Sequence, residues 1–254
     1  MKTSTFLIVA LSILVMQANA QKNAKPEDTE VYTPVPKRVD PGKPFCGVPS
    51  DAIVLFNGKD LDHWVSAKDL AQAAGWIIEN GRMKVNKEAG DIQTRDAYQD
   101  YQLHIEWRVP EHITGTGQAR GNSGVYLASV HGGGYEVQIL DNFNNSTYVN
   151  GMVGSVYKQH IPLANPIRPP GEWNVYDIIW RAPRFKKNGS LESPARVTVL
   201  FNGVLVQNNV SLQGRTEYIG KPSYKPHGAA PILLQSHGDP SEPISFQNIW
   251  LRPL

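Results

Sequence analysis

The sequence of 254 residues has one cysteine, Cys46, and almost no excess of charge of either sign. A single thiol cannot form a disulfide within the chain, so the fold must depend on its apolar core. The 25 Lys and Arg residues and 23 Asp and Glu residues leave a formal net charge of +2, with no long basic run. Because binding to a phosphate backbone requires clustered positive charge, the sequence excludes nucleic acid as the main partner.

Long hydrophobic runs are scarce, and the most apolar one lies near the start of the chain. It extends over residues 6–16, follows Lys2 and precedes the small-x-small triplet 18–20. Eleven positions are too few to span a bilayer. A positive start, a short apolar stretch and small residues are typical of a cleaved secretory signal. We therefore expect residues 1–20 to be removed, the protein to be exported to the periplasm or secreted, and no membrane span to remain.

Residues 21–50 are rich in proline, with six in this segment. Proline fixes φ and lacks a backbone donor, which predicts an extended arm with no element of its own. The apolar residues Val31, Tyr32 and Val35 favour an arm draped over the rest of the protein. The folded domain is expected to cover residues 51–254.

Short apolar or alternating runs, separated by Gly, Pro and Asn, fill this domain. The expected strands are 52–56, 76–79, 82–85, 101–109, 123–128, 135–140, 175–181, 196–201, 204–208, 232–235 and 244–251. Asn-Gly pairs at 57–58, 80–81, 188–189 and 202–203 indicate tight hairpins. Only residues 67–74 suggest a helix. The pattern predicts an all-β sandwich or jelly roll with a Pro-rich N-terminal arm, and it excludes a parallel α/β enzyme.

Side chains alternate across a strand, so each run can be sorted into two faces. In 101–109 the apolar face carries Leu103, Ile105 and Trp107, and in 135–140 it carries Val137 and Ile139. The opposite faces, together with the run 232–237, carry polar side chains suited to binding a polyol or moving a proton: His104, Glu106, Arg108, Glu136, Gln138, Gln235 and His237. We expect these to turn together toward one side of a sheet and form a sugar-sized groove.

Two loops add candidate sugar contacts. Residues 117–124 combine glycines with Arg120 and Asn122, whose donors suit hydroxyl groups. The stiff turn 168–174 presents Trp173, which could stack on a sugar ring or belong to the core.

Motifs of other enzyme classes are missing from the sequence. There is neither a Gly-x-Ser-x-Gly elbow nor a His-Glu-x-x-His motif, and no cofactor-binding fingerprint. Glu136 and Asp141 are five residues apart, which places them on opposite faces of a regular strand and weakens the case for a paired-carboxylate glycosidase. A divalent metal could be held if His104, Glu106, Glu136 and His237 converge, but no spacing demands one.

Nine motifs in order give the chain a resemblance to a known family. They are LFNGKDLDHW at 55–64, GDIQT at 90–94, NSGVY at 122–126, YEVQILD at 135–141, GSVY at 154–157, PPGEWN at 169–174, NGV at 202–204, LQSHG at 234–238 and FQNIW at 246–250. Together they resemble the 3-keto-disaccharide hydrolase family. The resemblance implies a concanavalin-like jelly roll that acts on sugars oxidised at C3, a small-molecule substrate that a sugar-oxidising enzyme would supply.

A ketone at C3 acidifies the hydrogen on C2, so a base can form an enolate and the C1 substituent can leave, with or without later addition of water. Glu136 is the expected base and His160 the expected acid. The expected contacts to hydroxyl groups and the enolate are Glu106, Arg108, Arg120, Asn122, Gln138, Asp141, Lys158, Trp173, Gln235 and His237. A non-catalytic carbohydrate-binding module and a conventional glycoside hydrolase remain alternatives.

Overall fold

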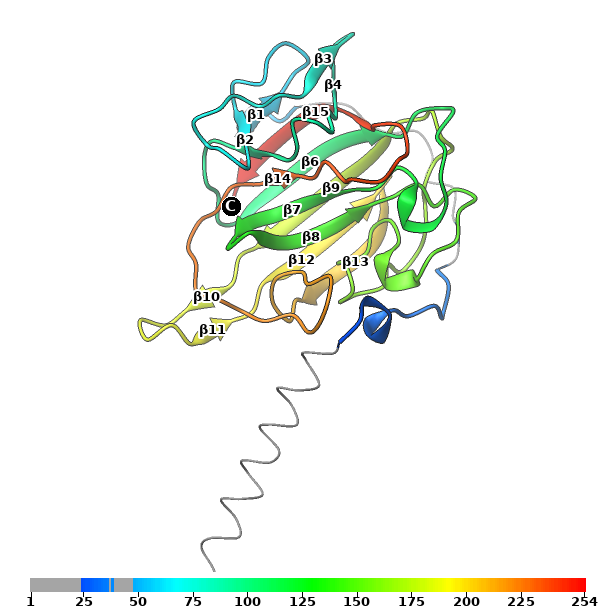
Figure 1. The fold of residues 1–254 in the computed structure, drawn as a ribbon. Helices are drawn as coiled ribbons and strands as arrows, with labels where there is room; N and C mark the ends of the chain where they lie inside the picture. The colour runs from blue at the N-terminus through cyan, green and yellow to red at the C-terminus, as the bar shows by residue number, and fades with distance from the viewer. Residues whose placement is uncertain (1–23, 37, 39–47) are drawn as a thin grey trace, which may run out of the picture.

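The computed structural model describes residues 24–36, 38 and 48–254, which form two antiparallel β-sheets packed face to face (Figure 1). The eight strands of the larger sheet are β1 (Ile53–Phe56), β3 (Ile77–Glu79), β4 (Arg82–Lys84), β6 (Tyr101–Arg108), β9 (Asn174–Arg181), β12 (Arg196–Phe201), β13 (Val204–Ser211) and β15 (Ser245–Pro253). The five strands of the smaller sheet are β2 (Trp64–Ser66), β5 (Ile92–Thr94), β7 (Ser123–Val130), β8 (Gly133–Ile139) and β14 (Leu233–Leu234). The all-β sandwich expected from the sequence is confirmed.

The order of the strands within each sheet is not their order in the chain. The larger sheet runs β13-β12-β9-β6-β15-β4-β3, with β1 also paired to β15, and the smaller sheet runs β2-β5-β14-β7-β8. A separate ribbon pairs β10 (Arg184–Phe185) with β11 (Leu191–Ser193). Consecutive strands therefore often lie in different sheets, which is what creates the two layers.

The core lies between the two sheets and is built by the period-2 alternation of the strands. On β6, Leu103, Ile105 and Trp107 are fully buried, as are Val137 and Ile139 on β8, so the expected apolar faces are confirmed. Hydrogen bonds cross between the layers: the Tyr101 hydroxyl donates to the carbonyl of Leu127 at 2.5 Å. Both sheets thus bury one face against the other and leave the opposite face outward.

Three of the four Asn-Gly pairs lie between paired strands, as the sequence predicts. Asn80-Gly81 joins β3 to β4 and Asn202-Gly203 joins β12 to β13, with positive φ at all four residues, as a type I′ hairpin turn requires. Asn188-Gly189 lies between β10 and β11. The hairpin expected at Asn57-Gly58 is wrong, because β1 and β2, on either side of it, belong to different sheets.

The helix expected over residues 67–74 is also wrong. This segment is a loop in which the Ser66 hydroxyl accepts hydrogen bonds from the backbone N–H groups of Lys68 and Asp69, at 3.3 and 3.4 Å. A side-chain acceptor of this kind competes with helical bonding. The strands that the sequence did not predict, β2, β10 and β11, have only two or three residues each, too few for a periodic pattern.

The N-terminal arm contains one short element, contrary to the expectation that it has none. A 3₁₀-helix covers Pro26–Thr29, and proline at its first position is already fixed near helical φ. The arm lies against the domain, where the guanidinium of Arg38 stands 3.8 Å above the ring of Phe143. Residues 1–20 and Cys46 lie outside the described residues. In the described segments, no helix has the length and apolar character needed to cross a bilayer.

Replacing Trp107 should test the central position of the core. Its ring is fully buried, with centroids 5.6 Å from Tyr176 and 5.8 Å from Phe201. Trp107→Ala is expected to lower the free energy of unfolding by about 3–5 kcal/mol in urea titrations. The exposed Ile179 on the neighbouring strand β9 is the control, and Ile179→Ala should cost about 1 kcal/mol or less. Equal losses for the two variants would contradict this account of the core.

Candidate functional site

A cavity of about 760 Å³ lies on the outer face of the smaller sheet. Tyr126 of β7 and Glu136 and Gln138 of β8 line it from the sheet. Loops after β14, around residues 118–122 and around 216–218 form its sides, and residue Glu30 of the N-terminal arm contributes as well. Most of these lining side chains are polar, which suits a ligand that carries many hydroxyl groups.

Glu136 is held within the cavity wall by its neighbours on β7. It pairs across the sheet with Tyr126, and its side chain is almost fully buried. A Cβ atom added at Gly124 would lie 2.6 Å from Glu136 Oε1, so any larger residue at position 124 would displace the carboxyl group. The local sequence therefore fixes both the position and the burial of this acid.

The environment of Glu136 favours its neutral form. Burial raises its pKa to about 8, against the lowering effect of a hydrogen bond with the Tyr126 hydroxyl, and the negative charge of Asp91 raises it further. Burial also raises the pKa of Asp91. A carboxyl group that titrates near pH 8 is suited to exchange a proton under physiological conditions.

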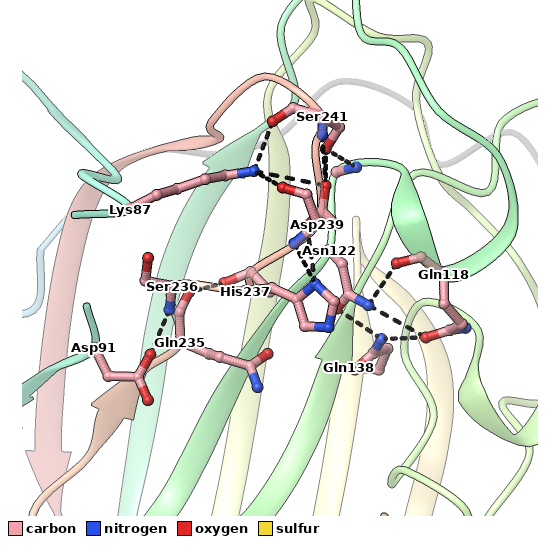
Figure 2. A network of polar contacts seen from close by, with 12 residues as sticks. Lys87, Asp91, Gln118, Asn122, Gln138, Gln235, Ser236, His237, Asp239 and Ser241 are labelled. Carbon is pink, nitrogen blue, oxygen red and sulfur yellow. Dashed lines mark hydrogen bonds and ion pairs between the residues drawn. The ribbon is translucent and has the colours of Figure 1, made fainter. Parts of the chain in front are cut away.

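A histidine and an aspartate lie in contact at the cavity (Figure 2). His237 Nδ1 lies 2.9 Å from Asp239 Oδ2, and the Ser241 hydroxyl donates to the other oxygen of Asp239. Burial opposes ionisation of Asp239, but the hydrogen bonds from His237 and Ser241 outweigh it and lower the pKa of this carboxyl group. Lys87 Nζ stands 3.6 Å from Asp239 Oδ1. The contact with Asp239 fixes the orientation of the imidazole.

Carboxamide side chains cover the remaining part of the cavity floor (Figure 2). Gln138 Nε2 donates to Gln118 Oε1 at 3.2 Å and to Asn122 Oδ1 at 3.1 Å, and Gln235 Nε2 donates to the Tyr126 hydroxyl at 3.4 Å. Within the described part of the chain, neither Gln138 Oε1 nor Gln235 Oε1 accepts a hydrogen bond, although both are buried. Buried acceptors without partners are unusual, and hydroxyl groups of a ligand would satisfy them.

The structure does not bring all the predicted polar residues to one side. Glu106 and Arg108 lie on β6 in the larger sheet, whereas Glu136 and Gln138 lie on β8 in the smaller one. Each strand buries its apolar face between the layers, so the two polar sets point away from each other. The expectation of a shared groove is therefore wrong, and His104 and Glu106 do not converge with Glu136 and His237. Among the residues that the structure describes, no group of three or more His, Cys, Asp and Glu side chains is gathered as a metal site.

Five other predicted site residues do not line the cavity. Arg120 Nε donates to the buried Asp141 at 2.6 Å, which fixes the loop between β6 and β7. His160 Nε2 lies 2.9 Å from the carbonyl of Ser211. The guanidinium carbon of Arg108 lies over the ring of Trp173, 4.9 Å from the centroid of that ring. Lys158 Nζ donates to the carbonyls of Pro26 and Tyr218. Local partners already occupy each of these side chains.

The structure also adds residues that the sequence reasoning missed. Tyr126 follows Gly124 with the same parity on β7, so the alternation used for the other strands would have found it. Asp239 stands two residues after His237, a spacing that lets an aspartate reach Nδ1 of a histidine. Glu30 could not be found from sequence patterns, because only the fold brings the arm to the cavity.

A comparison with known proteins identifies the family of this chain. A model of the 3-keto-α-glucoside-1,2-lyase-like domain matches residues 51–252. The chain belongs to this family. The resemblance inferred from the nine motifs is thereby confirmed, and the match begins after the N-terminal arm.

The chain is similar to two solved structures and to one named enzyme. A crystal structure from Parabacteroides distasonis ATCC 8503, assigned by name to the glycosyl hydrolases, is 57% identical, with a TM-score of 0.79 over 90% of this chain and 96% of that one. A second such structure from the same strain, at 23% identity and a TM-score of 0.58 over 80% of this chain and 94% of that one, shares the fold. A 3-keto-disaccharide hydrolase of Bacteroides thetaiotaomicron is 24% identical over 165 residues, 52% of this chain. The matched region spans about half of that relative, 54% of its length.

On the opposite face of the sandwich, His104 and Glu106 form a buried charged cluster. His104 Nδ1 lies 2.7 Å from Asp177 Oδ1, and Glu106 accepts hydrogen bonds from Gln247 and Asn248 at 2.6 and 2.7 Å. Burial alone would lower the pKa of His104, but Asp177 and Glu106 outweigh it and raise that pKa to about 9. The cluster stabilises the fold while the imidazole is protonated.

This cluster makes stability depend on pH in a defined window. Because the folded pKa of His104 exceeds its ordinary value of 6.5, its contribution is complete below about pH 6.5 and is lost as pH rises through about 9. The free energy of unfolding should fall over that window by on the order of 2–3 kcal/mol. His104→Gln should flatten this dependence in urea titrations at several pH values. An unchanged slope in the variant would contradict the assignment.

Proposed function

We propose that this protein cleaves the glycosidic bond of glycosides oxidised at C3, by abstraction of the C2 proton and elimination of the C1 substituent. The observation that carries the proposal is Glu136, a buried acid in a polar cavity with a pKa raised to about 8. The family match supports the same class of substrate.

The other carboxyl groups at the cavity each have a local partner. Asp239 is bound by His237, Glu217 accepts from Arg215 Nε at 2.7 Å, and Glu30 accepts from the hydroxyl of Tyr32 at 2.7 Å. Direct hydrolysis by a glycosidase requires two carboxyl groups that act on the same bond. Elimination from a 3-keto sugar requires one base, donors for the enolate and one acid, which fits this cavity better.

The reaction balances with the residues of the site. Ionised Glu136 takes the proton from C2, and the electrons of the C2–H bond form an enolate with the C3 ketone. The enolate then forms the C1=C2 double bond while the C1–O bond breaks, and the leaving oxygen takes a proton. When water adds across the double bond, its oxygen bonds to C1 and a proton returns to C2, so the net reaction is hydrolysis. The amide of Gln235, which donates one N–H group to the Tyr126 hydroxyl, is suited to hold a sugar oxygen with the other.

His237 is the acid in this proposal and replaces His160. The imidazole of His237 lies at the cavity and is oriented by Asp239, whereas His160 is bound to the carbonyl of Ser211 away from the cavity. A protonated imidazole can deliver its proton to the leaving oxygen and so prevent a charged leaving group.

Export and substrate supply remain part of the proposal. The pattern of residues 1–20 is that of a secretory signal, and a substrate with a C3 ketone must come from an enzyme that oxidises sugars. Detection of the processed protein in the periplasm or medium, with its N-terminus determined by mass spectrometry, tests the first point. Retention of the unprocessed chain in the cytoplasm would contradict it.

The substrate class is tested with matched pairs of glycosides. Purified protein should release the aglycone from a 3-keto-glucoside and not from the unoxidised glucoside of the same aglycone. Release from both would indicate a conventional glycoside hydrolase. Binding without release from either would indicate a carbohydrate-binding module.

Glu136→Gln should lower turnover of the 3-keto-glucoside by at least about a hundredfold, the lower range for the loss of a general base. The amide keeps the shape of the side chain, so binding of the substrate should survive in calorimetry. Lys68→Gln, in an exposed loop outside the cavity, serves as the control and should keep normal turnover. Near-normal turnover by Glu136→Gln would show that another group removes the proton.

The pH profile should report the same acid. Because the base must be ionised, kcat/KM should rise about tenfold per pH unit as the pH approaches the pKa of Glu136, about 8, from below. Asp91→Asn removes a nearby negative charge and should shift the inflection to lower pH. A profile with no inflection between pH 7 and 9, or one that Asp91→Asn leaves in place, would contradict the role of Glu136.

A further inference from the structure

The N-terminal arm forms part of the cavity that holds Glu136. Glu30 lines this cavity next to Tyr148 and Tyr218 of the domain. The arm lies outside the segment that matches the family, which begins at residue 51. In Figure 1 the arm, in blue, runs beside the loops that follow β8. The wall of the site therefore includes a segment that the family match does not cover.

Hydrogen bonds from the domain fasten the arm on both sides of Glu30. Asn150 Nδ2 donates to the carbonyl of Thr29 at 2.8 Å, and Asn150 Oδ1 accepts from the N–H of Val31 at 3.0 Å. Lys158 Nζ donates to the carbonyl of Pro26 at 2.9 Å. The side chain of Asn150 thus bridges the residues before and after Glu30 and fixes the backbone there.

Lys158 holds the arm and the aromatic wall together. Its ammonium group lies 4.9 Å from the ring centroid of Tyr218, 5.5 Å from that of Tyr148 and 5.7 Å from that of Tyr157. It also donates to the carbonyl of Tyr218 at 2.9 Å. These contacts make Lys158 a positioning residue behind the cavity, a different role from the substrate contact expected from the sequence.

A pair of tyrosines stands between the arm and the base. The hydroxyl groups of Tyr148 and Tyr157 lie 2.5 Å apart, and Tyr32 of the arm packs edge-on against Tyr148. Burial raises the pKa of Tyr157 to about 12, and the charges of Glu136 and Glu30 both add to this effect. Tyr157 is therefore close enough to both carboxyl groups to sense their charge, with Glu136 on the sheet and Glu30 on the arm.

We propose that Glu30 is a specificity residue that binds the leaving sugar of a 3-keto-disaccharide. The inference rests on the proposed function, because Glu136 must then reach C2 of the oxidised ring. The cavity of about 760 Å³ is within the range that encloses ligands larger than one ring. The Tyr32 hydroxyl donates to Oε2 of Glu30, and no donor among the described residues reaches Oε1, which can therefore accept from sugar hydroxyl groups.

The charge of the wall defines the class of leaving sugar. Among the described residues that line the cavity, four are acidic (Glu30, Glu136, Glu217 and Asp239), and none is Lys or Arg. A uronic acid or a phosphorylated sugar would bring a negative charge beside these groups, with neither Lys nor Arg in the described lining to bind it. The subsite therefore fits a neutral sugar.

Glu30→Ala tests the proposal through the ratio of two KM values. The KM of a neutral 3-keto-disaccharide is divided by the KM of the 3-keto methyl glycoside. This ratio should rise about tenfold in the variant, the low end for loss of a hydrogen bond to a charged group. The kcat for the disaccharide should change less than twofold. Glu27→Gln removes a charge from an exposed position in the 3₁₀-helix that precedes Glu30, and it should leave the KM ratio and kcat unchanged. An unchanged ratio in Glu30→Ala would overturn the proposal.

Binding measurements separate this proposal from the proposed function. In a Glu136→Gln background, calorimetry with the 3-keto-disaccharide should show an affinity about tenfold lower when Glu30→Ala is added. If the affinity falls in this way but the wild-type protein turns over no 3-keto-glycoside, the subsite would be supported and the proposed reaction rejected. Normal turnover together with equal affinities would reject the subsite alone. Hydrogen exchange should also slow in residues 24–32 when the disaccharide binds, and unchanged exchange there would contradict contact with the arm.

Discussion

Every strand of the sandwich can give only one of its two faces to the core, and the remaining features of the molecule depend on that constraint. On β8 the core takes Val137 and Ile139, so Glu136 and Gln138 must face outward from the smaller sheet. On β6 the core takes the apolar set that includes Trp107, so Glu106 faces outward from the larger sheet. One rule of alternation thus produces a cavity on one side and a charged cluster on the other.

The same constraint explains how two buried glutamates come to behave differently. Glu106 accepts hydrogen bonds from amides and lies beside a protonated histidine, and although burial opposes ionisation, these partners lower its pKa. Glu136 has a tyrosine hydroxyl and a nearby aspartate as neighbours, and burial raises its pKa to about 8. The first carboxylate is stabilised as a charge within the fold, whereas the second is left able to exchange a proton. Environment, and not residue type, gives the two carboxyl groups opposite pKa shifts.

The sequence predicts single strands well and their assembly poorly. Alternation identifies the buried face of β6 and β8 because it is a local property of each run. Which sheet a strand joins depends on long-range pairs such as Phe246 with Trp107, which no local pattern encodes. Alternation along single strands was therefore enough to predict that Glu136, Gln235 and His237 line a site. It was not enough to show that His160 and Arg120 lie outside the cavity. Their partners, the carbonyl of Ser211 and the carboxylate of Asp141, are known only from the fold.

The most direct measurement of the central claim follows the hydrogen on C2. A 3-keto-glucoside with deuterium at C2 would be cleaved by the protein in ordinary water, and the deuterium content of the sugar product measured by mass spectrometry against an enzyme-free control for spontaneous exchange. If Glu136 removes this atom before the glycosidic bond breaks, the product should lose the deuterium to solvent, and aglycone release should be slower than from the unlabelled substrate. Release at the same rate with the deuterium retained at C2 would contradict the elimination mechanism.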